Sequence, residues 1–396
     1  MREKKSKIAE KDLQGFKYFK KLSGLLHGLH EAGCARDRAH NRILHMDQYM
    51  TLLLLCLFSP ICTSLRAMQQ ASCLAKVQKK LRVPRSSLGS LSESARLFDS
   101  SLLQEIIEEL VGELKHTPST AALKDVRGII TLVDGTLLKE LPRTVEALWQ
   151  DADHKAYKVH LQYELLKGVP VSAEVTGANI SEKAVFSDHL ESNRLYVMDR
   201  GYVKYGLFQE IIDKGSSFVC RIYDQAVFEP LEERAISQKA NEAGVRRDVL
   251  VRLGTQHAGR ALTQPVRIVE LECTECSTRN AHAIRRGLKP GNRMWLATDR
   301  MDLPAETIGF IYRCRWQIEI FFRFFKHILG CRHLLSYNQN GIELQTYAAI
   351  IACLLISLYT GRKPTLRTYE MLCWNMIGWA SDEELSRHIE GLKKQD

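Results

Sequence analysis

The segment YRCRWQIEIFFRFFK, residues 312–326, places one carboxylate among three hydrogen-bond donors. On an α-helix of about 100° per residue these polar side chains form a stripe roughly 60° wide, whose members are Tyr312, Arg315, Glu319 and Lys326. An apolar face lies beside the stripe and contains Ile311, Ile318, Phe322, Phe325 and Leu329. Glu319 is therefore expected at the margin of a buried surface, where a carboxylate is costly unless a cation or metal ion meets it.

Two aspartates are predicted to close β-strands elsewhere in the chain. Asp134 ends the β-branched run GIITLVDGT, and Asp199 ends RLYVMDRGY. If the strands are neighbours and the helix carrying Glu319 packs across them, the three acids converge at one edge of the sheet. Oxygen ligands of this kind suit Mg²⁺, and two such ions about 4 Å apart support phosphodiester chemistry.

Each acid also has a plain structural explanation. An Asp-Gly pair after a strand is a common turn signal, which applies to Asp134, and Asp199 in MDRG is open to the same interpretation. Glu319 could form a structural ion pair with Arg315 or Arg323, both at i±4 helical spacing. The combination of two strand-end aspartates with the polar helix stripe favours the metal site.

The acids are expected to be positioned by four regions that follow one another along the chain. Residues 1–120 show helical spacing of apolar residues and many lysines and arginines, which predicts a helical, basic DNA-binding region ending in the linker His116–Thr120. Residues 121–222 and 293–345 alternate strands with short helices, as in a mixed α/β catalytic domain. Residues 223–292 between them predict a β-rich insertion without a clear helix, and residues 346–396 predict C-terminal helices.

Composition limits the class of protein. The chain has 396 residues, 45% of them hydrophobic, and a net charge of +10, which favours an anionic partner such as nucleic acid. The apolar runs near Leu52–Phe58 and Ala348–Leu358 are too short to span a bilayer, so both are expected to be core helices and no membrane partner is predicted. With no secretory signal and 11 scattered cysteines, a cytoplasmic protein in a reducing compartment is expected.

The spacing Tyr312-x₂-Arg315-x₃-Glu319-x₆-Lys326 matches the Tyr-Arg-Glu-Lys signature of a large family of bacterial insertion-sequence transposases, the insertion-sequence-four type. The chain also resembles this family in LVDGT, in YVMDRGY and in the order of its regions, over roughly residues 80–360. The resemblance implies an RNase H-like catalytic core interrupted by a β-rich insertion. It implies cutting at transposon ends and strand transfer by the freed 3′-hydroxyl.

The resemblance also implies roles for single residues and partners. The metal-binding catalytic triad would be Asp134, Asp199 and Glu319, holding two Mg²⁺ ions that Mn²⁺ can replace. Phosphates of the transposon end would be contacted by Tyr312, Arg315 and Lys326, whose side chains offer a hydroxyl, a bidentate fork and a point charge. Since two ends must be joined, a homodimer on double-stranded DNA is expected.

Trp295 resembles the aromatic residue on which some members of this family stack a flipped base. A buried core tryptophan is the alternative at this position.

Two other functions fit parts of the sequence. A transposase-derived DNA-binding regulator without catalysis would keep the basic character, although three converging carboxylates that repel phosphate serve no purpose in a pure binder. An RNase H-like nuclease that cuts without strand transfer would keep the acids. The favoured prediction is a metal-dependent DNA transposase.

Overall fold

The structure is a computed structural model and describes residues 24–38, 40–59, 61–115, 121–138, 156–254, 262–272, 293–328 and 334–393. Its strands are β1 (Ile129–Leu138), β2 (Tyr157–Glu164), β3 (Val169–Gly177), β4 (Arg194–Met198), β5 (Ser217–Ile222), β6 (Phe228–Glu233), β7 (Val245–Leu253), β8 (Val266–Glu272) and β9 (Arg293–Thr298). The helices before β4 are α2 (Leu29–Ala32), α3 (Met46–Phe58), α4 (Leu65–Ser72), α5 (Ala75–Leu81), α6 (Leu88–Leu97), α7 (Leu102–Glu113) and α8 (Glu182–Asp188). The later helices are α9 (Tyr205–Asp213), α10 (Gln238–Glu242), α12 (Ala305–Cys314), α13 (Trp316–Ile328), α14 (Gln339–Thr360), α15 (Leu366–Met376) and α16 (Asp382–Lys393).

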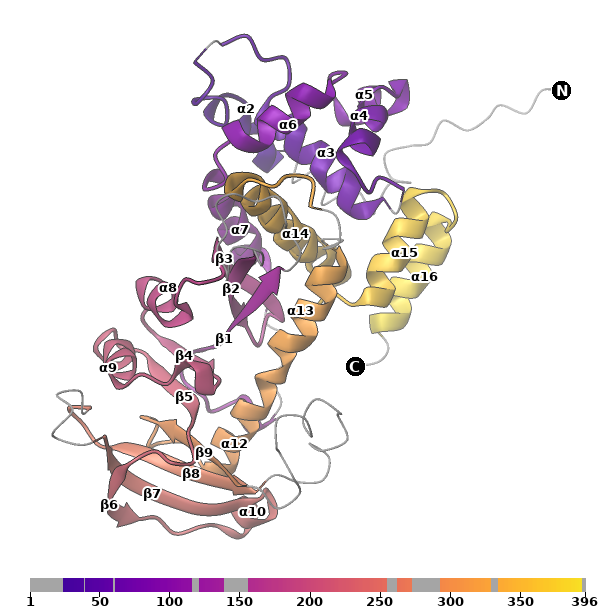
Figure 1. The fold of residues 1–396 in the computed structure, drawn as a ribbon. Helices are drawn as coiled ribbons and strands as arrows, with labels where there is room; N and C mark the ends of the chain where they lie inside the picture. The colour runs from indigo at the N-terminus through magenta and orange to yellow at the C-terminus, as the bar shows by residue number, and fades with distance from the viewer. Residues whose placement is uncertain are drawn as a thin grey trace.

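The described strands form one sheet in the order β3-β2-β1-β4-β5-β9-β8-β7-β6. Strand β4 pairs parallel with β1 on one side and with β5 on the other. All the other pairs of neighbouring strands in this sheet are antiparallel. The predicted mixed α/β architecture with helices before and after the sheet is thus present (Figure 1).

The first strand is longer than expected. The Asp134-Gly135 pair was predicted to end it, yet β1 continues to Leu138. The continuation is held by β2, whose antiparallel ladder reaches Leu138↔Tyr157, so a cross-strand partner overrides the local turn signal.

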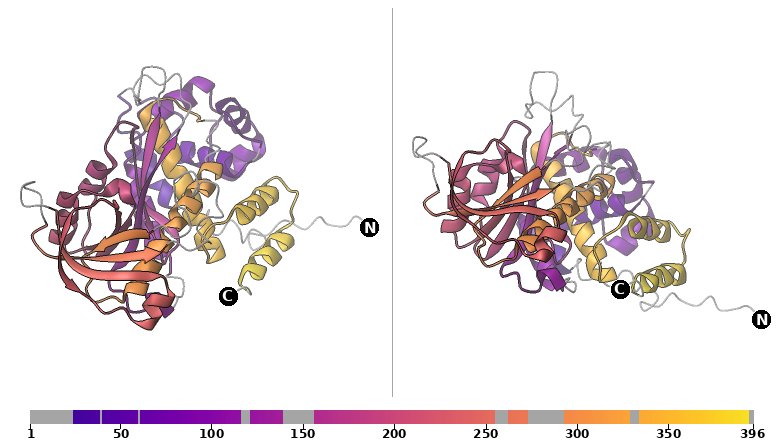
Figure 2. Two further views of the ribbon diagram at one scale, coloured as in Figure 1. Left: turned by 60° about the horizontal axis from the view of Figure 1, so that its bottom comes forward. Right: turned by 90° about the horizontal axis from the view of Figure 1, so that it is seen from below.

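Each face of the sheet has its own hydrophobic core. Alternate side chains of the central strands, such as Leu132 and Val197, pack with α12, α13, α14 and the N-terminal helices. The intervening side chains, such as Val133 and Met198, pack with α8 and α9. Figures 1 and 2 show α8 and α9 on the opposite side of the sheet from α12 and α13. The sheet is therefore covered on both faces around β1, β4 and β5.

The chain between β5 and β9 extends the sheet. Strands β6, β7 and β8 join it through β9, and the short helix α10, which the sequence pattern did not predict, lies between β6 and β7. Helix α12 packs closely on β8 at Gly309. A Cβ added to this glycine would lie only 3.1 Å from both terminal methyl carbons of Leu271. This close contact fixes the height of the helix above the sheet.

A buried ion pair connects this region to the start of α12. The guanidinium of Arg267 donates to both carboxylate oxygens of Asp248, at 2.7 and 2.6 Å, and to the carbonyl of Leu303 at 2.5 Å. Both charged side chains are at most 4% exposed. Since Leu303 directly precedes Pro304, the N-cap of α12, the pair holds the beginning of the helix that leads to Glu319.

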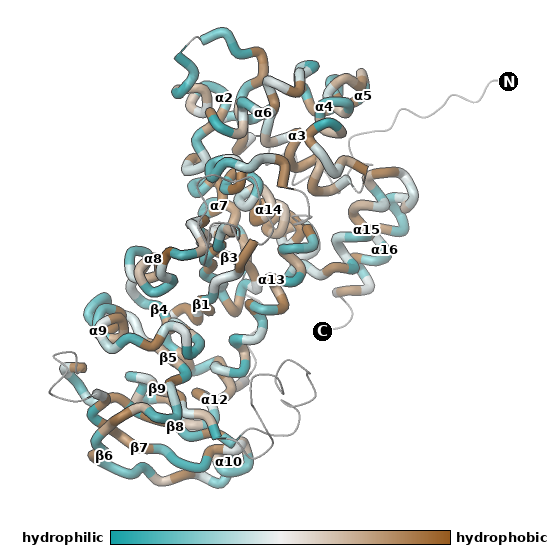
Figure 3. The backbone as a smooth tube through the Cα atoms, in the orientation of Figure 1, coloured by the Kyte–Doolittle hydropathy of each residue, from teal (hydrophilic) through white to brown (hydrophobic). Residues whose placement is uncertain are grey.

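The core helices predicted from apolar runs are present, and one is longer than expected. Helix α14 has 22 residues and is by length and composition able to cross a membrane, but 89% of its apolar window is buried inside the protein. It contacts α3, α7 and β3, and its hydrophobic stretch is visible in Figure 3. The predicted domain limit at residue 345 falls inside this helix, and the predicted linker at 116–120 lies outside the described residues.

Replacing Asp248 by alanine should destabilise the protein by about 3–5 kcal/mol, because the Arg267 charge would remain buried without its partner. Urea unfolding monitored by circular dichroism measures this loss. The matched control is Glu229→Ala, which removes the partner of Arg252 in an exposed pair and should cost less than about 1 kcal/mol. Equal effects of the two substitutions would contradict a structural role for the buried pair.

Candidate active site

The register of two parallel strands places the predicted aspartates side by side. The last pair of the β1–β4 ladder is Leu132↔Val197. Two residues further along each strand, the same offset brings Asp134 next to Asp199, and neighbouring strands lie about 4.8 Å apart. The strand register thus accounts for the proximity of Asp134 to Asp199, which directly follows β4 as the N-cap of the next helical turn.

Side-chain alternation gives both aspartates the same direction. Residues two apart on a strand share a face, so Asp134 lies on the face of Leu132, and Asp199 on that of Val197. Those two apolar residues belong to the core that includes Ile318 of α13. The two carboxylates therefore face the helices that carry the polar stripe.

The predicted signature helix is interrupted at one residue. It was expected to be continuous over residues 312–326, but α12 ends at Cys314 and α13 begins at Trp316. At the junction the amide of Arg315 donates to the carbonyl of Tyr312 at 3.0 Å, and Ile318 donates back to Arg315 at 3.1 Å. These tighter i→i−3 bonds are typical of 3₁₀ turns.

Arg315 connects two of the three predicted acids. One guanidinium nitrogen, Nη2, donates to Oε1 of Glu319 at 2.7 Å, and the other, Nη1, lies 3.5 Å from Oδ2 of Asp134. The exposed fractions are 12% for the Arg315 side chain, 19% for Asp134 and 24% for Glu319. Of the two arginines weighed as partners of Glu319, the structure pairs it with Arg315.

Backbone amides hold the two aspartates as well. Oδ1 of Asp134 accepts from the amide of Gly135 at 2.8 Å. Oδ1 of Asp199 accepts from the amide of Gly201 at 2.7 Å, which caps the short helical turn after β4. Each carboxylate is thus oriented through its Oδ1 atom by a backbone amide close by in the chain, within β1 for Asp134 and in the turn after β4 for Asp199.

Burial and negative neighbours raise the pKa of Asp134 to about 7 from an ordinary value of 3.8. Burial is the largest cause, while Arg315 lowers this pKa and the charges of Asp199 and Glu319 raise it. The charges of Asp199 and Glu319 both act on this pKa, so the three carboxylates lie in one electrostatic environment.

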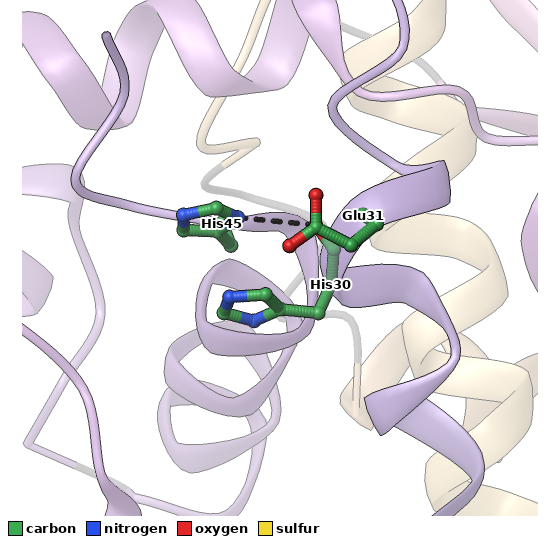
Figure 4. Close-up of side chains that lie close together, drawn as sticks. All are labelled: His30, Glu31 and His45. Atoms are coloured by element: carbon green, nitrogen blue, oxygen red, sulfur yellow. Dashed lines mark hydrogen bonds between the residues drawn. The ribbon is translucent and has the colours of Figure 1, made fainter. Parts of the chain in front are cut away.

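The donor set suits a hard divalent cation. All three side chains offer carboxylate oxygens, and a buried cation, Arg315, already compensates two of them. Asp134, Asp199 and Glu319 do not form a group whose three ligand atoms all lie within 4.8 Å of one another; among the described residues that group is His30, Glu31 and His45 (Figure 4). The three predicted acids are therefore too far apart to bind one shared ion as placed, and Arg315 lies between two of them.

The other predicted residues lie at different distances from these acids. Tyr312 is half-buried on α12, and the Arg315 guanidinium carbon lies 5.9 Å from the centre of its ring. Lys326 is half-buried on α13, seven residues beyond Glu319. Trp295 is half-buried on β9 and packs edge-on against Phe228 at 5.3 Å, within the core on the α8–α9 side.

The predicted apolar face of the helix is confirmed where the structure describes it. Ile311, Ile318, Phe322 and Phe325 are buried, and Leu329 lies outside the described residues. Phe321 and Phe324 are buried too, because they meet Tyr163 of β2 and Tyr369 of α15.

Arg221 is a further candidate site residue, which the sequence motifs do not include. The β4–β5 ladder ends at Met198↔Cys220, so the next offset pair is Asp199 and Arg221. The Nε atom of Arg221 is buried and has no hydrogen-bond partner among the described residues. Its charge lowers the pKa of Tyr312, although burial raises that pKa on balance. Strand alternation in SFVCRI was the signal that could have identified it.

Clustered carboxylates of this kind can hold the divalent cations that are used in phosphodiester chemistry. Residues 127–355 match the family model described as the transposase DDE domain. This match covers more than half of the chain and contains all three acids. The chain belongs to the family of DDE-domain transposases.

Known proteins support this assignment. A protein of Sinorhizobium fredii named as the transposase y4zB is 25% identical over 257 residues, covering 64% of this chain and 67% of that protein. A Geobacillus stearothermophilus protein named as the transposase for insertion sequence element IS5377 is 24% identical over 200 residues, covering 50% of this chain and 48% of the relative.

A solved structure also resembles the chain distantly. The piggyBac transposase in its synaptic complex with hairpin DNA aligns with a TM-score of 0.43 and 9% identity, over 96% of this chain and 81% of that one.

Replacing Asp134 by asparagine should change how stability depends on pH in the absence of metal. Because the pKa is about 7 in the folded protein and 3.8 ordinarily, the folded state binds the extra proton between these values, and wild-type stability falls as pH rises through this window. The free energy of unfolding of the variant, relative to that of the wild type, should therefore rise by about 2–3 kcal/mol from pH 5 to pH 8. Urea unfolding in chelator measures it.

The exposed Asp188 on α8 provides the control. Asp188→Asn should show no pH-dependent gain over wild type. If Asp134→Asn behaves in the same way, Asp134 is not held in a buried, negative environment.

Proposed function

We propose that this transposase cuts DNA at the ends of its own element and joins them to target DNA, by phosphodiester hydrolysis followed by transesterification. The observation that carries the proposal is the meeting of Asp134 and Glu319 on the Arg315 guanidinium, with Asp199 in the neighbouring register position. These residues lie within the matched transposase domain.

In this proposal Asp134, Asp199 and Glu319 hold two Mg²⁺ ions, which Mn²⁺ can replace. The all-oxygen donor set fits such ions. When bound, they supply activation of the attacking oxygen and charge stabilisation at the leaving oxygen. The raised pKa of Asp134 has a consequence for loading, because a carboxyl must lose its proton to ligate, so affinity for the ions should fall below about pH 7.

Arg315 has two tasks in this scheme. Without DNA it compensates the negative charge of Asp134 and Glu319. A DNA phosphate would compete with these carboxylates for the same guanidinium fork, since arginine binds both in bidentate fashion. Tyr312 and Lys326 are proposed to contact neighbouring phosphates through a hydroxyl and an ammonium group, and Arg221 adds positive charge beside them.

The finer architecture belongs to the same proposal. Strands β3-β2-β1-β4-β5 would form an RNase H-like core, completed by α12 and α13, and residues 223–292 would be its insertion. Residues 1–120 and the insertion would grip the ends of the element, with Trp295 as a stacking surface for a flipped base. The protein would act in the cytoplasm, on the bacterial nucleoid, as a homodimer that holds two ends.

Substituting any of the three acids should abolish cutting while leaving DNA binding intact. Asp134→Asn, Asp199→Asn and Glu319→Gln are expected to lower the rate of end cleavage by a factor of about 10³ or more, because each removes a negative ligand from the site. Gel assays of cleavage and of binding, with Mg²⁺ and DNA carrying the ends of the chain's own element, separate the two effects.

The exposed Asp188 again serves as the control, and Asp188→Asn should cut at the wild-type rate. Full cleavage by any of the three acid variants would overturn the proposed triad. Wild-type binding without cleavage would favour a regulator, and nicks without joined products would favour a nuclease.

Arg315→Ala should weaken both DNA cutting and the metal-free fold. The rate of cleavage should fall roughly 100-fold, as on removal of one preorganised donor. Because Arg315 lowers the pKa of Asp134, its loss should also lower stability more at pH 8 than at pH 5. The control is Arg323→Ala, an exposed arginine at i+4 from Glu319 on the same helix. If both variants cut equally well, the role given to Arg315 is wrong.

A further inference from the structure

Two cysteine side chains meet at the corner between helices α3 and α4. Cys56 lies in the last turn of α3, and Cys62 lies in the connection that leads to Ser64, the N-cap of α4. Both are free thiols, and their sulfur atoms are only 2.6 Å apart. Because the sulfur atoms of a disulfide lie about 2.05 Å apart, an approach of roughly 0.5 Å would join them.

The backbone between the two cysteines brings the sulfur atoms together. The amide of Ser59 donates to the carbonyl of Cys56 at 3.2 Å, and the amide of Cys62 donates to the carbonyl of Ser59 at 3.2 Å. The corner is also held from outside, because the hydroxyl of Tyr369 on α15 donates to the carbonyl of Leu57. The contact between the two thiols is therefore built into the local fold.

The two thiols differ in reactivity. The thiol of Cys56 donates a hydrogen bond to the sulfur of Cys62, and this bond is the largest cause that lowers the pKa of Cys62 and raises that of Cys56. The thiolate is the nucleophilic form of cysteine, so Cys62 is the thiol that attacks first.

Access to the pair favours a small reagent. Each cysteine is 8% exposed, while Ile61, directly before Cys62, is 74% exposed. Redox-responsive cysteines commonly combine a lowered pKa with a second cysteine close by that resolves the first oxidation product. Here Cys62 and Cys56 have these two properties.

We propose that Cys56 and Cys62 form a redox-active pair that hydrogen peroxide converts into a disulfide. The Cys62 sulfur attacks one peroxide oxygen, the O–O bond breaks, and Cys62 becomes a sulfenic acid as one water leaves. The Cys56 sulfur then attacks the Cys62 sulfur, the S–O bond breaks, and a second water leaves. Both sulfurs are oxidised and both peroxide oxygens reduced, and the two thiol protons end in the two waters.

The bond would close a ring over residues 56–62 and tie the end of α3 to the start of α4. A dithiol reductant would reopen the ring by thiol–disulfide exchange. The site is independent of the acids on the sheet and of the function proposed for them.

Alkylation and mass spectrometry of the full chain test this site. The reduced protein is treated with a few equivalents of hydrogen peroxide, unfolded, alkylated and digested with trypsin. Residues 43–66 form one tryptic peptide whose cysteines are Cys56 and Cys62. We expect this peptide to become lighter by two hydrogen atoms and to lose both sites of alkylation. Dithiothreitol should restore both sites.

Single variants separate the two roles. In Cys56→Ser the sulfenic acid of Cys62 should persist and be captured by dimedone, and in Cys62→Ser the buried Cys56 should stay alkylatable. The control is Cys73→Ser, which removes an exposed cysteine outside the pair and should form the disulfide as the parent does. The oxidised parent should also unfold at a higher urea concentration than the reduced parent, because the ring restricts the unfolded chain, and Cys56→Ser should lack this shift.

Circular dichroism of each variant checks that the helices remain. Two alkylatable thiols in residues 43–66 of the folded, peroxide-treated parent would overturn the proposal. The pairing of Cys62 with any cysteine other than Cys56 would overturn it as well.

Discussion

The parallel pairing of β1 with β4 creates an electrostatic problem that shapes the rest of this site. Its register sets Asp134 next to Asp199 on the face where α13 brings Glu319, and three carboxylates in partly buried surroundings repel one another. In the metal-free protein the guanidinium of Arg315 compensates for this, holding Glu319 at 2.7 Å and Asp134 at 3.5 Å. The compensation is incomplete, because burial and the other two carboxylates still raise the pKa of Asp134.

The surrounding structure serves to deliver Arg315 and Glu319 to that position. The start of α12 is held through the carbonyl of Leu303 by the buried Arg267–Asp248 pair. Helices α12 and α13 meet at Arg315, whose side chain reaches Asp134 on the sheet. Helix α13 continues between β2 and α15 through Phe321 and Phe324. Strands β6 to β8 thus contribute to the site without supplying any of its acids.

Local patterns were enough to predict much of this. The short helices α8 and α9, the strand that contains Asp134 and the strand that precedes Asp199 follow from apolar spacing and β-branched runs. The signature spacing identified the face of Glu319. The rest depends on distant partners. Pairing with β2 extends β1 beyond Gly135, and packing on Tyr369 buries Phe324. The break at Arg315 could not be predicted from a local signal, because no proline or glycine lies at it. The His30–His45 stack required two segments 15 residues apart to meet.

Anomalous diffraction from crystals of the protein soaked in Mn²⁺ tests the central claim most directly. The account predicts manganese peaks bounded by the carboxylates of Asp134, Asp199 and Glu319, with the Arg315 guanidinium displaced from at least one of its two acidic partners. Crystals saturated with manganese that show no peak at these carboxylates, while Arg315 keeps both contacts, would contradict it.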